Sequence, residues 1–455
     1  MTEDTAKRRP APTDTPVALT VAGSDSGGGA GIQADLKTME AVGAFGTSVV
    51  TAVTAQNTAS VESTHVLPTE EIEAQLDAVL ADFELGAAKT GMLATTEVIE
   101  LVAERAPELQ PLVVDPVMVA ASGDRLLASE AEDAYEALVA ESTLVTPNAD
   151  EAAVLTDTEP TDEPSAREAG EALVAMGADA ALVKGGHLDT GGEVVDTLVT
   201  ADGVERFSHP RVDTDATHGS GCTLASAVAA EMALGTDRRT AVARATDLLE
   251  RAVRYGHAVG KRGAVNHLAV VREHAERDPT AQAVAGVVAA LVREDAAALV
   301  PEVGLNVAGA TPFAEATDEV AAVEGRITRT PDGIRPNRGV RFGASSHVAR
   351  FLLSVREHDP AVRFCLNARF DEEVESAMER LDWTVAEFDR SSEPDPESGG
   401  TMGWGAARAL ETVEETPHAV VDRGAVGKEP MARLLAADAE GLRERALALL
   451  DALGG

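Results

Sequence analysis

Several kinds of residue are scarce in this 455-residue sequence. It contains two cysteines, six lysines and 3% aromatic residues, and no run of eighteen apolar residues. The two cysteines, Cys222 and Cys365, cannot build a disulfide framework or a four-ligand zinc site. The polar N-terminus lacks the apolar region of a secretory signal, and no segment is apolar enough to cross a membrane. We therefore expect a cytoplasmic protein in a reducing compartment.

Positive charge is also scarce. Lys and Arg number 38 against 77 Asp and Glu, which gives a formal net charge of −39. Such a surface repels phosphate backbones and anionic membranes, so we expect neither nucleic acid nor membrane as a partner. The acidic residues occur in every segment and lysine is rare, which favours a halophilic protein. An ordinary acidic protein would explain the charge but not the scarcity of lysine.

The first half of the sequence alternates strand-like and helical patterns. Apolar strand-like segments cover 17–23, 47–56, 85–92, 111–118, 142–148 and 178–186, and helical spacing covers 32–44, 69–83, 96–106, 129–141 and 165–177. Strands that alternate with helices of this length predict an α/β fold with a mostly parallel sheet covered on both faces.

Composition suggests a domain boundary in the middle of the chain. Two helical segments follow Thr223, and a charged stretch then ends at Pro279 before another helical run. We predict a disordered tail over 1–14, a first domain over 15–268, a linker over 269–284 and a smaller α/β domain over 285–455. The Pro- and Gly-rich stretch 389–405 is interpreted as a loop.

The segment THGSGC at 217–222 precedes a helical pattern. Glycine-rich turns at helix N-termini expose backbone N–H groups and bind anions. We expect the helix start to lower the pKa of Cys222, so that its sulfur can accept a proton. No Walker-type segment is present, so any ATP is bound without a P-loop. The alternative is a tight strand–helix connection with Cys222 as a small buried apolar residue.

Six separated segments carry a family resemblance. They are the stretch 19–58 with AGSDSGGGAG, KTGML at 89–93, VVDPVM at 113–118, TPNADEA at 146–152, VKGGH at 183–187 and THGSGC. In order and spacing they resemble the hydroxymethylpyrimidine/phosphomethylpyrimidine kinases of thiamine synthesis, which are ribokinase-like. The resemblance covers about residues 15–265, and the runner-up for this half is a pyridoxal kinase.

The resemblance implies roles for individual residues. Gly219, Ser220 and Gly221 would form an anion hole for the transferred phosphoryl group of ATP, with Cys222 as the general base. The pyrimidine pocket would contain Gly23, Asp25, Gln56, Met92 and Val119. Asn148 and Glu151 would organise Mg²⁺, through water at Glu151, and Lys184 would balance phosphate charge.

The second half resembles the archaeal type of thiamine-phosphate synthase over about residues 285–455. The segments carrying this resemblance are VAAVEGRITRT, GVRFGASSHVARFLLS, CLNARF, GTMGWG and DRGAVGKEPM. The resemblance implies that Arg326 and His347 are required for synthase activity. Asn367, Arg369 and Lys428, with glycine turns at 399–405, would line the same anion-binding site.

Together the two resemblances imply a complete reaction sequence. Hydroxymethylpyrimidine would be phosphorylated twice with ATP, and the diphosphate would condense with thiazole phosphate to give thiamine phosphate. We expect small-molecule substrates and a homo-oligomer. The alternative keeps the kinase, possibly of pyridoxal type, and makes the second domain a non-catalytic sensor of thiamine phosphate, as in thiamine-responsive repressors.

Overall fold

The computed structural model describes residues 14–119, 126–127, 131–186, 191–389, 401–413, 415–425 and 427–454. The chain divides into two compact units, Met1–Val270 and Val271–Gly455. The tail predicted over 1–14 lies almost wholly outside the described residues. Within them, no helix is long and apolar enough to cross a membrane.

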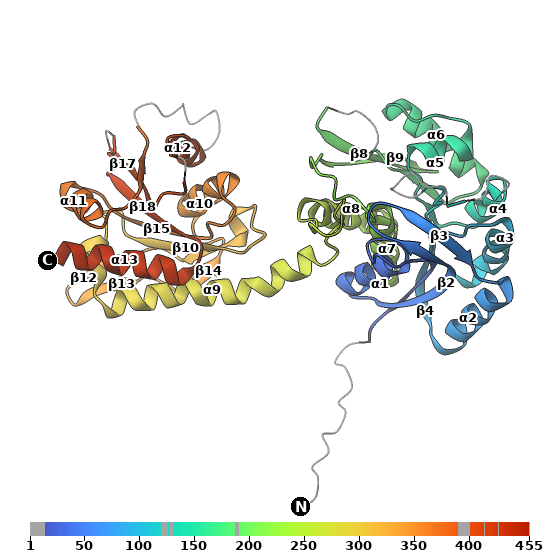
Figure 1. Cartoon of the computed structure of the whole chain (residues 1–455), viewed down its shortest axis with the longest axis horizontal. Coiled ribbons are helices and arrows are strands. Elements are labelled where there is room, and N and C mark those ends of the chain that lie inside the picture. Colours follow the sequence, from blue (N-terminus) through green and yellow to red (C-terminus); the bar gives the residue numbers. More distant parts are fainter. Residues whose placement is uncertain are drawn as a thin grey trace, which may run out of the picture. The chain divides into compact units, whose positions relative to one another are not determined.

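The first unit is built on one nine-stranded sheet (Figure 1). Its spatial order is β3-β2-β1-β4-β5-β6-β7-β8-β9. The strands are β1 Val17–Asp25, β2 Phe45–Gln56, β3 Val61–Val66, β4 Leu85–Thr90, β5 Leu112–Val114, β6 Leu144–Val145, β7 Ala180–Val183, β8 Glu193–Thr200 and β9 Gly203–Pro210. Six strands that are neighbours in space, β2, β1, β4, β5, β6 and β7, pair in parallel. The other three strands, β3, β8 and β9, pair antiparallel at the two edges. The predicted mostly parallel sheet is confirmed.

Helices cover both faces of this sheet, as Figure 1 shows. They are α1 Gly31–Val42, α2 Thr69–Asp82, α3 Thr96–Arg105, α4 Tyr135–Ala140, α5 Ala149–Thr156, α6 Glu163–Met176, α7 Ser220–Ala233 and α8 Arg238–Arg254. Leucines of α2, α3 and α4 pack with Leu19 and Val21 of β1 on one face, while α7 and α8 bury alanines and valines on the other. Because β1 is buried on both faces, its sequence is almost continuously apolar, which explains why it could be predicted.

The second unit contains a seven-stranded, mostly antiparallel sheet of order β14-β11-β10-β15-β18-β17-β16. Its strands are β10 Asn306–Ala310, β11 Val320–Val323, β14 Val340–Phe342, β15 Phe364–Arg369, β16 Val385–Glu387, β17 Ala419–Asp422 and β18 Met431–Ala436, and β12 Ile327–Thr330 pairs separately with β13 Gly333–Pro336. Its helices are α9 Ala269–Arg293, α10 Ser346–His358, α11 Glu372–Arg380, α12 Thr401–Leu410 and α13 Ala439–Gly454. The second α/β region is therefore confirmed.

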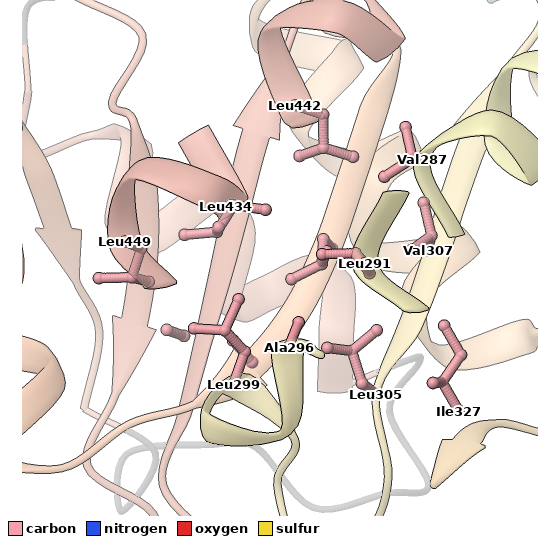
Figure 2. Close-up of a cluster of buried hydrophobic side chains, with 14 of the residues drawn as sticks. Val287, Leu291, Ala296, Leu299, Leu305, Val307, Ile327, Leu434, Leu442 and Leu449 are labelled. Carbon is pink, nitrogen blue, oxygen red and sulfur yellow. The ribbon is translucent and has the colours of Figure 1, made fainter. Parts of the chain in front are cut away.

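Two apolar layers hold the second unit together. Figure 2 shows one of them, in which Val287 and Leu291 of α9 meet Leu442 and Leu449 of α13 over the strands. On the opposite face, Phe351 and Leu352 of α10 pack with Ala406 and Ala409 of α12. The sheet is thus sandwiched between helices, and loops at its ends are free to carry polar groups.

Two expectations about connections were wrong. The segment 269–284, predicted as a linker, is helical throughout, because α9 continues from Ala269 to Arg293 with Pro279 inside it. Most of its charged residues are at least partly exposed, although Glu273 is buried, and buried Thr280 and Val284 face the core. The stretch 389–405 is not a loop to its end, because α12 begins at Thr401. Residues 390–400 lie outside the described part of the chain.

Candidate active site

The predicted kinase residues gather at one edge of the first sheet. Asp25 ends β1, Asp115 follows β5, Asn148 follows β6 and Lys184 follows β7. Carboxyl ends of parallel strands meet at one edge, which is where open α/β sheets bind ligands. A cavity of about 560 Å³ lies there, and its walls include every kinase-site residue named from the sequence.

The loop before α7 exposes backbone donors to this cavity. Gly219 adopts φ +87°, and a Cβ there would lie 1.8 Å from the carbonyl oxygen of Gly29. Only glycine fits at this position. The N–H groups of Ser220 and Thr223 donate to Thr217 and Gly219. No hydrogen bond within the described residues uses the N–H groups of Gly221 and Cys222, so the helix start can receive an anion.

Asp25 organises the neighbouring glycine loop. Its carboxylate accepts from the N–H groups of Gly27 (2.7 Å), Gly29 (3.0 Å) and Ala30 (2.8 Å), and from His218 Nε2 (3.1 Å). Burial acts to raise the pKa of Asp25, but these hydrogen bonds outweigh it and hold the pKa below its usual range. The carboxylate therefore stays ionised, and it fixes the loop as well as lining the cavity.

The environment of Cys222 differs from expectation. The thiol is partly exposed in the cavity wall, and burial raises its pKa to about 12, although the Lys89 ammonium acts in the opposite direction. The expected lowering by the helix start is therefore wrong, because loss of water around the thiol outweighs the helix dipole. Cys222 can then accept a proton only if nearby positive charge stabilises its thiolate.

A buried charged group beside Cys222 was missed by the sequence reasoning. Lys89 of β4 is 0% exposed, and its Nζ donates to Asp35 Oδ1 of α1 at 2.9 Å. Thr20 Oγ1 and Ser226 Oγ also donate to this carboxylate, each at 2.6 Å. A lysine inside the apolar strand LGAAKT was the available signal, since lysine is almost never buried without a partner.

Asn148, Glu151 and Lys184 are brought together as predicted. Asn148 and Glu151 form a capping box at the start of α5, with bonds of 2.9 and 2.8 Å. Lys184 Nζ lies 3.8 Å from Glu151 Oε2 and 2.9 Å from Asp115 Oδ1. Burial raises the pKa of Glu151 to about 7, with Lys184 lowering it and Asp115 raising it. Asp115, another member of this cluster, was not singled out from the sequence.

The predicted pyrimidine-pocket residues also line this cavity. Gly23 lies so close to Met92 that a Cβ would be 3.0 Å from Met92 Sδ. Gln56 ends β2 and accepts from Thr54 Oγ1 through Oε1 at 3.2 Å. Val119 is 46% exposed, so it offers apolar surface to a ligand. The wall combines apolar contact with one amide, as an aminopyrimidine would require.

In the second unit, Arg326 and Asn367 lie beside the same turn. Arg326 follows β11 and donates to the carbonyl of Val303, while Asn367 of β15 donates to the carbonyl of Gly304 at 3.2 Å. The side-chain amide of Asn306 donates to the carbonyls of Val323 and Gly325 and so stabilises the segment just before Arg326. The exposed guanidinium of Arg326 is therefore carried on a well-bonded turn.

The other predicted residues of the second unit are placed differently. Arg369 is paired with Asp371 and Glu373, so its charge is already balanced. Lys428 lies on an exposed turn, and the next residue, Glu429, accepts from the N–H groups of Glu302 and Val303. His347 is exposed in the first turn of α10, and its one hydrogen bond within the described residues is to Ser346. No contact in the described part of the chain joins His347 to Arg326.

Comparison with known proteins agrees with this division into two. Residues 25–266 match the family model of phosphomethylpyrimidine kinase, and residues 283–448 match that of thiamine-phosphate synthase ThiN. A hydroxymethylpyrimidine/phosphomethylpyrimidine kinase of Streptomyces coelicolor is 48% identical over 259 residues, which is 56% of this chain and 96% of that protein. The thiamine biosynthesis bifunctional protein ThiED of Geobacter sulfurreducens is 45% identical over 57% of this chain and 54% of that protein.

A solved structure supports the fold of the first unit. The pyridoxal kinase of Bacillus subtilis, determined as an ADP complex, is 34% identical over 57% of this chain and 99% of that chain, with a TM-score of 0.53. The first unit is thus similar to kinases whose names give pyrimidine or pyridoxal substrates.

Proposed function

Because the chain belongs to the phosphomethylpyrimidine kinase family and continues into a thiamine-phosphate synthase domain, we propose that it makes thiamine phosphate from hydroxymethylpyrimidine, ATP and thiazole phosphate. The observation that carries the kinase half is that one cavity contains Cys222, the unpaired N–H groups in the first turn of α7, the buried Lys89 and the partly buried Lys184. Curated relatives named as pyrimidine kinases reach 48% identity, against 34% for the pyridoxal kinase structure, which favours the pyrimidine substrate.

The first phosphorylation requires a base and an anion site. The pyrimidine would lie against Gly23, Gln56 and Met92 with its hydroxymethyl group toward Cys222. As that oxygen attacks the γ-phosphate of ATP, the sulfur of Cys222 takes its proton and ADP leaves. The N–H groups of Gly221 and Cys222 then receive the negative charge of the transferred group.

The carboxylates near Lys184 fit a magnesium ion. Asp115 and Glu151 supply hard oxygen atoms, which Mg²⁺ prefers. Lys184 already contacts both carboxylates, so these residues fit the ion best through its water shell. When bound, Mg²⁺ would neutralise charge on the nucleotide phosphates. Asn148 keeps the Glu151 carboxylate oriented through the capping box.

For the second unit we propose that Arg326 and His347 act on the pyrimidine diphosphate. Condensation with thiazole phosphate expels diphosphate, so the chemistry requires stabilisation of a strongly negative leaving group. Arg326, supported by Asn367 and the Lys428 turn, offers positive charge at the end of β11. Arg369 contributes less, because two carboxylates already engage it.

The proposal is tested by supplying the purified chain with hydroxymethylpyrimidine, thiazole phosphate and Mg-ATP in high salt and measuring thiamine phosphate. Pyridoxal offered in parallel tests the runner-up substrate. If the chain forms the pyrimidine diphosphate and binds thiamine phosphate but never makes it, the second unit is a sensor. If pyridoxal alone is phosphorylated, the kinase assignment is wrong.

A further inference from the structure

The Lys89 ammonium has unused bonding capacity at the cavity. A lysine ammonium carries three N–H donors, and Lys89 has one acceptor among the described residues, Asp35 Oδ1. Lys89 lines the cavity but Asp35 does not. Its Nζ lies beneath Gly91, where a Cβ would be 3.2 Å away.

Two hydroxyl groups also hold Asp35. Thr20 of β1 donates to Oδ2 and Ser226 of α7 donates to Oδ1, the oxygen that Lys89 also engages, while Asp35 itself does not line the cavity. The buried pair is therefore a fixed dipole whose positive end faces the ligand space. Such preoriented charge acts strongly because water does not screen it.

The same helix places Cys222 next to this dipole. Ser226 and Cys222 are four residues apart on α7, so they share one face, one turn from each other. Because Ser226 bonds to Asp35, Cys222 lies over the Asp35–Lys89 pair. Burial acts to lower the pKa of Lys89, but Asp35 and Cys222 outweigh it and raise the pKa, so the ammonium stays charged.

Other charged groups also face the cavity near Cys222. Asp115 acts to raise the pKa of the thiol, as Asp35 does, and Cys222 in turn helps to raise the pKa of Lys184. Elsewhere on the wall are the Asp25–His218 pair and the side chains of Asp150, Asp196, His209, Arg211 and Glu250. Among all of these, the Lys89 ammonium most strongly favours the thiolate.

We propose that Lys89 is the positioning residue for Cys222, because its ammonium favours the thiolate form that takes the hydroxyl proton of the first substrate. This inference rests on the proposed function. The two phosphorylations then differ in what they need. In the first, an O–P bond forms, the P–O bond to ADP breaks and the hydroxyl proton moves to sulfur. In the second, the nucleophile is a phosphate monoester, whose second pKa is about 6, so its oxygen needs no base.

The Lys89–Cys222 pair therefore serves the first step and not the second. Lys89→Met alone would leave the Asp35 carboxylate without its cation and strongly destabilise the unit. The informative pair is Asp35→Asn, whose amide oxygen can still accept from the Lys89 ammonium, and the double variant Asp35→Asn/Lys89→Met. Both lack the carboxylate, so they differ only in the ammonium.

The first readout is the rate of Cys222 alkylation by iodoacetamide against pH, followed on its own peptide by mass spectrometry. Relative to wild type, Asp35→Asn should move the inflection to lower pH, because Asp35 disfavours the thiolate. The double variant should move it to higher pH than Asp35→Asn. A merely structural role for Lys89 would give the two variants the same inflection.

The second readout is turnover of each substrate separately. From Asp35→Asn to the double variant, phosphorylation of hydroxymethylpyrimidine should fall at least about tenfold in kcat, because one pKa unit is tenfold in thiolate. Phosphorylation of its monophosphate should change by less than about threefold. Equal losses in both steps, or an unmoved inflection, would overturn the inference. A wild-type chain that phosphorylates neither compound would instead overturn the proposed function, while the alkylation result would still decide the Lys89–Cys222 pair.

Discussion

The two candidate sites of this chain are built in opposite ways. In the first unit, Asp25, Asp35 and Lys89 are almost fully buried; several donors hold each aspartate, and Lys89 is bound to Asp35. In the second unit, Arg326, His347 and Lys428 are exposed on turns or at a helix start. Buried charges are fixed by the fold itself, so their loss should affect stability and catalysis together. Exposed cations should affect catalysis alone.

The sharpest test of the buried site is Gly219→Ala. A methyl group there would overlap the carbonyl of Gly29, and φ +87° strains any side chain, so both phosphorylations should be abolished. Gly235→Ala is the matched control, because Gly235 has φ +81° with no atom near a new Cβ. It should cost about 1 kcal/mol of stability and leave turnover near wild type. Equal activities of the two variants would contradict the anion-hole assignment.

Removing the thiol should have the next largest effect. Cys222→Ala should slow phosphorylation of hydroxymethylpyrimidine about 10²–10⁴-fold, because the proton acceptor is lost while the backbone donors remain. The melting temperature should barely change. Cys222→Asp, which restores a carboxylate base, should recover part of the rate. Wild-type turnover by Cys222→Ala would exclude it as the base.

Substitutions at the exposed site should separate the two activities. Arg326→Ala and His347→Ala should each reduce thiamine phosphate formation from supplied pyrimidine diphosphate about 10²–10³-fold, since positive charge at the leaving group is lost. Kinase turnover and melting temperature should stay unchanged. Arg338→Ala is the control, because Arg338 is an exposed arginine paired with Glu324. If Arg326→Ala also lost kinase activity, the prediction that the exposed site acts independently of the kinase would be wrong.

Glu151→Gln should change the pH dependence of stability. The pKa of this carboxyl is raised to about 7 in the folded unit, so the native state binds more protons than the unfolded chain from about pH 4.5 to 7. Glu151 therefore lowers stability as pH rises through this range. In the variant, the free energy of unfolding should therefore decline less as pH rises, by up to roughly 3 kcal/mol. Urea unfolding between pH 5 and 8 measures this difference. Identical slopes for both proteins would show that the carboxyl titrates normally.

Salt should affect both units in the same direction. With a net charge of −39, unscreened repulsion opposes the compact state, and salt shortens its range to roughly 10 Å or less. The melting temperature should therefore rise between dilute buffer and molar KCl. An unchanged value would contradict the halophilic interpretation. The expected homo-oligomer stays a prediction, which the same samples can test by sedimentation.

Much of the first unit could be predicted because its strands are continuously apolar and end in polar motifs. The loop at 217–222, the Asn148–Glu151 pair and Lys184, all named from the sequence, line one cavity at the edge of the sheet. Asp35 and Lys89 were missed because Asp35 is one of several polar residues of α1 and Lys89 is a single lysine in an apolar strand, and only the fold shows that they meet. The pKa of Cys222 was predicted in the wrong direction, since the sequence shows the helix start but not the depth of burial.

The second unit was harder to predict in detail. The segment GVRFGASSHVARFLLS contains the start of α10 at Ser346, where the Ser345 side chain makes no capping bond. The continuity of α9 was missed because its exposed face is highly charged and Pro279 was interpreted as a helix boundary. Whether Arg326 and His347 act together stays a prediction.

The long sequence separation within the kinase site bears on how the unit is made. His218 bonds to Asp25 across 193 residues, and Ser226 bonds to Asp35 across 191. At about 5–20 residues per second, a ribosome reaches the second partner roughly 10–40 s after the first. Until then the glycine loop lacks His218, and Asp35 lacks one of its donors. The nascent chain therefore has no complete nucleotide site before these two contacts form. We expect both contacts to form late and cooperatively, and activity to appear with them.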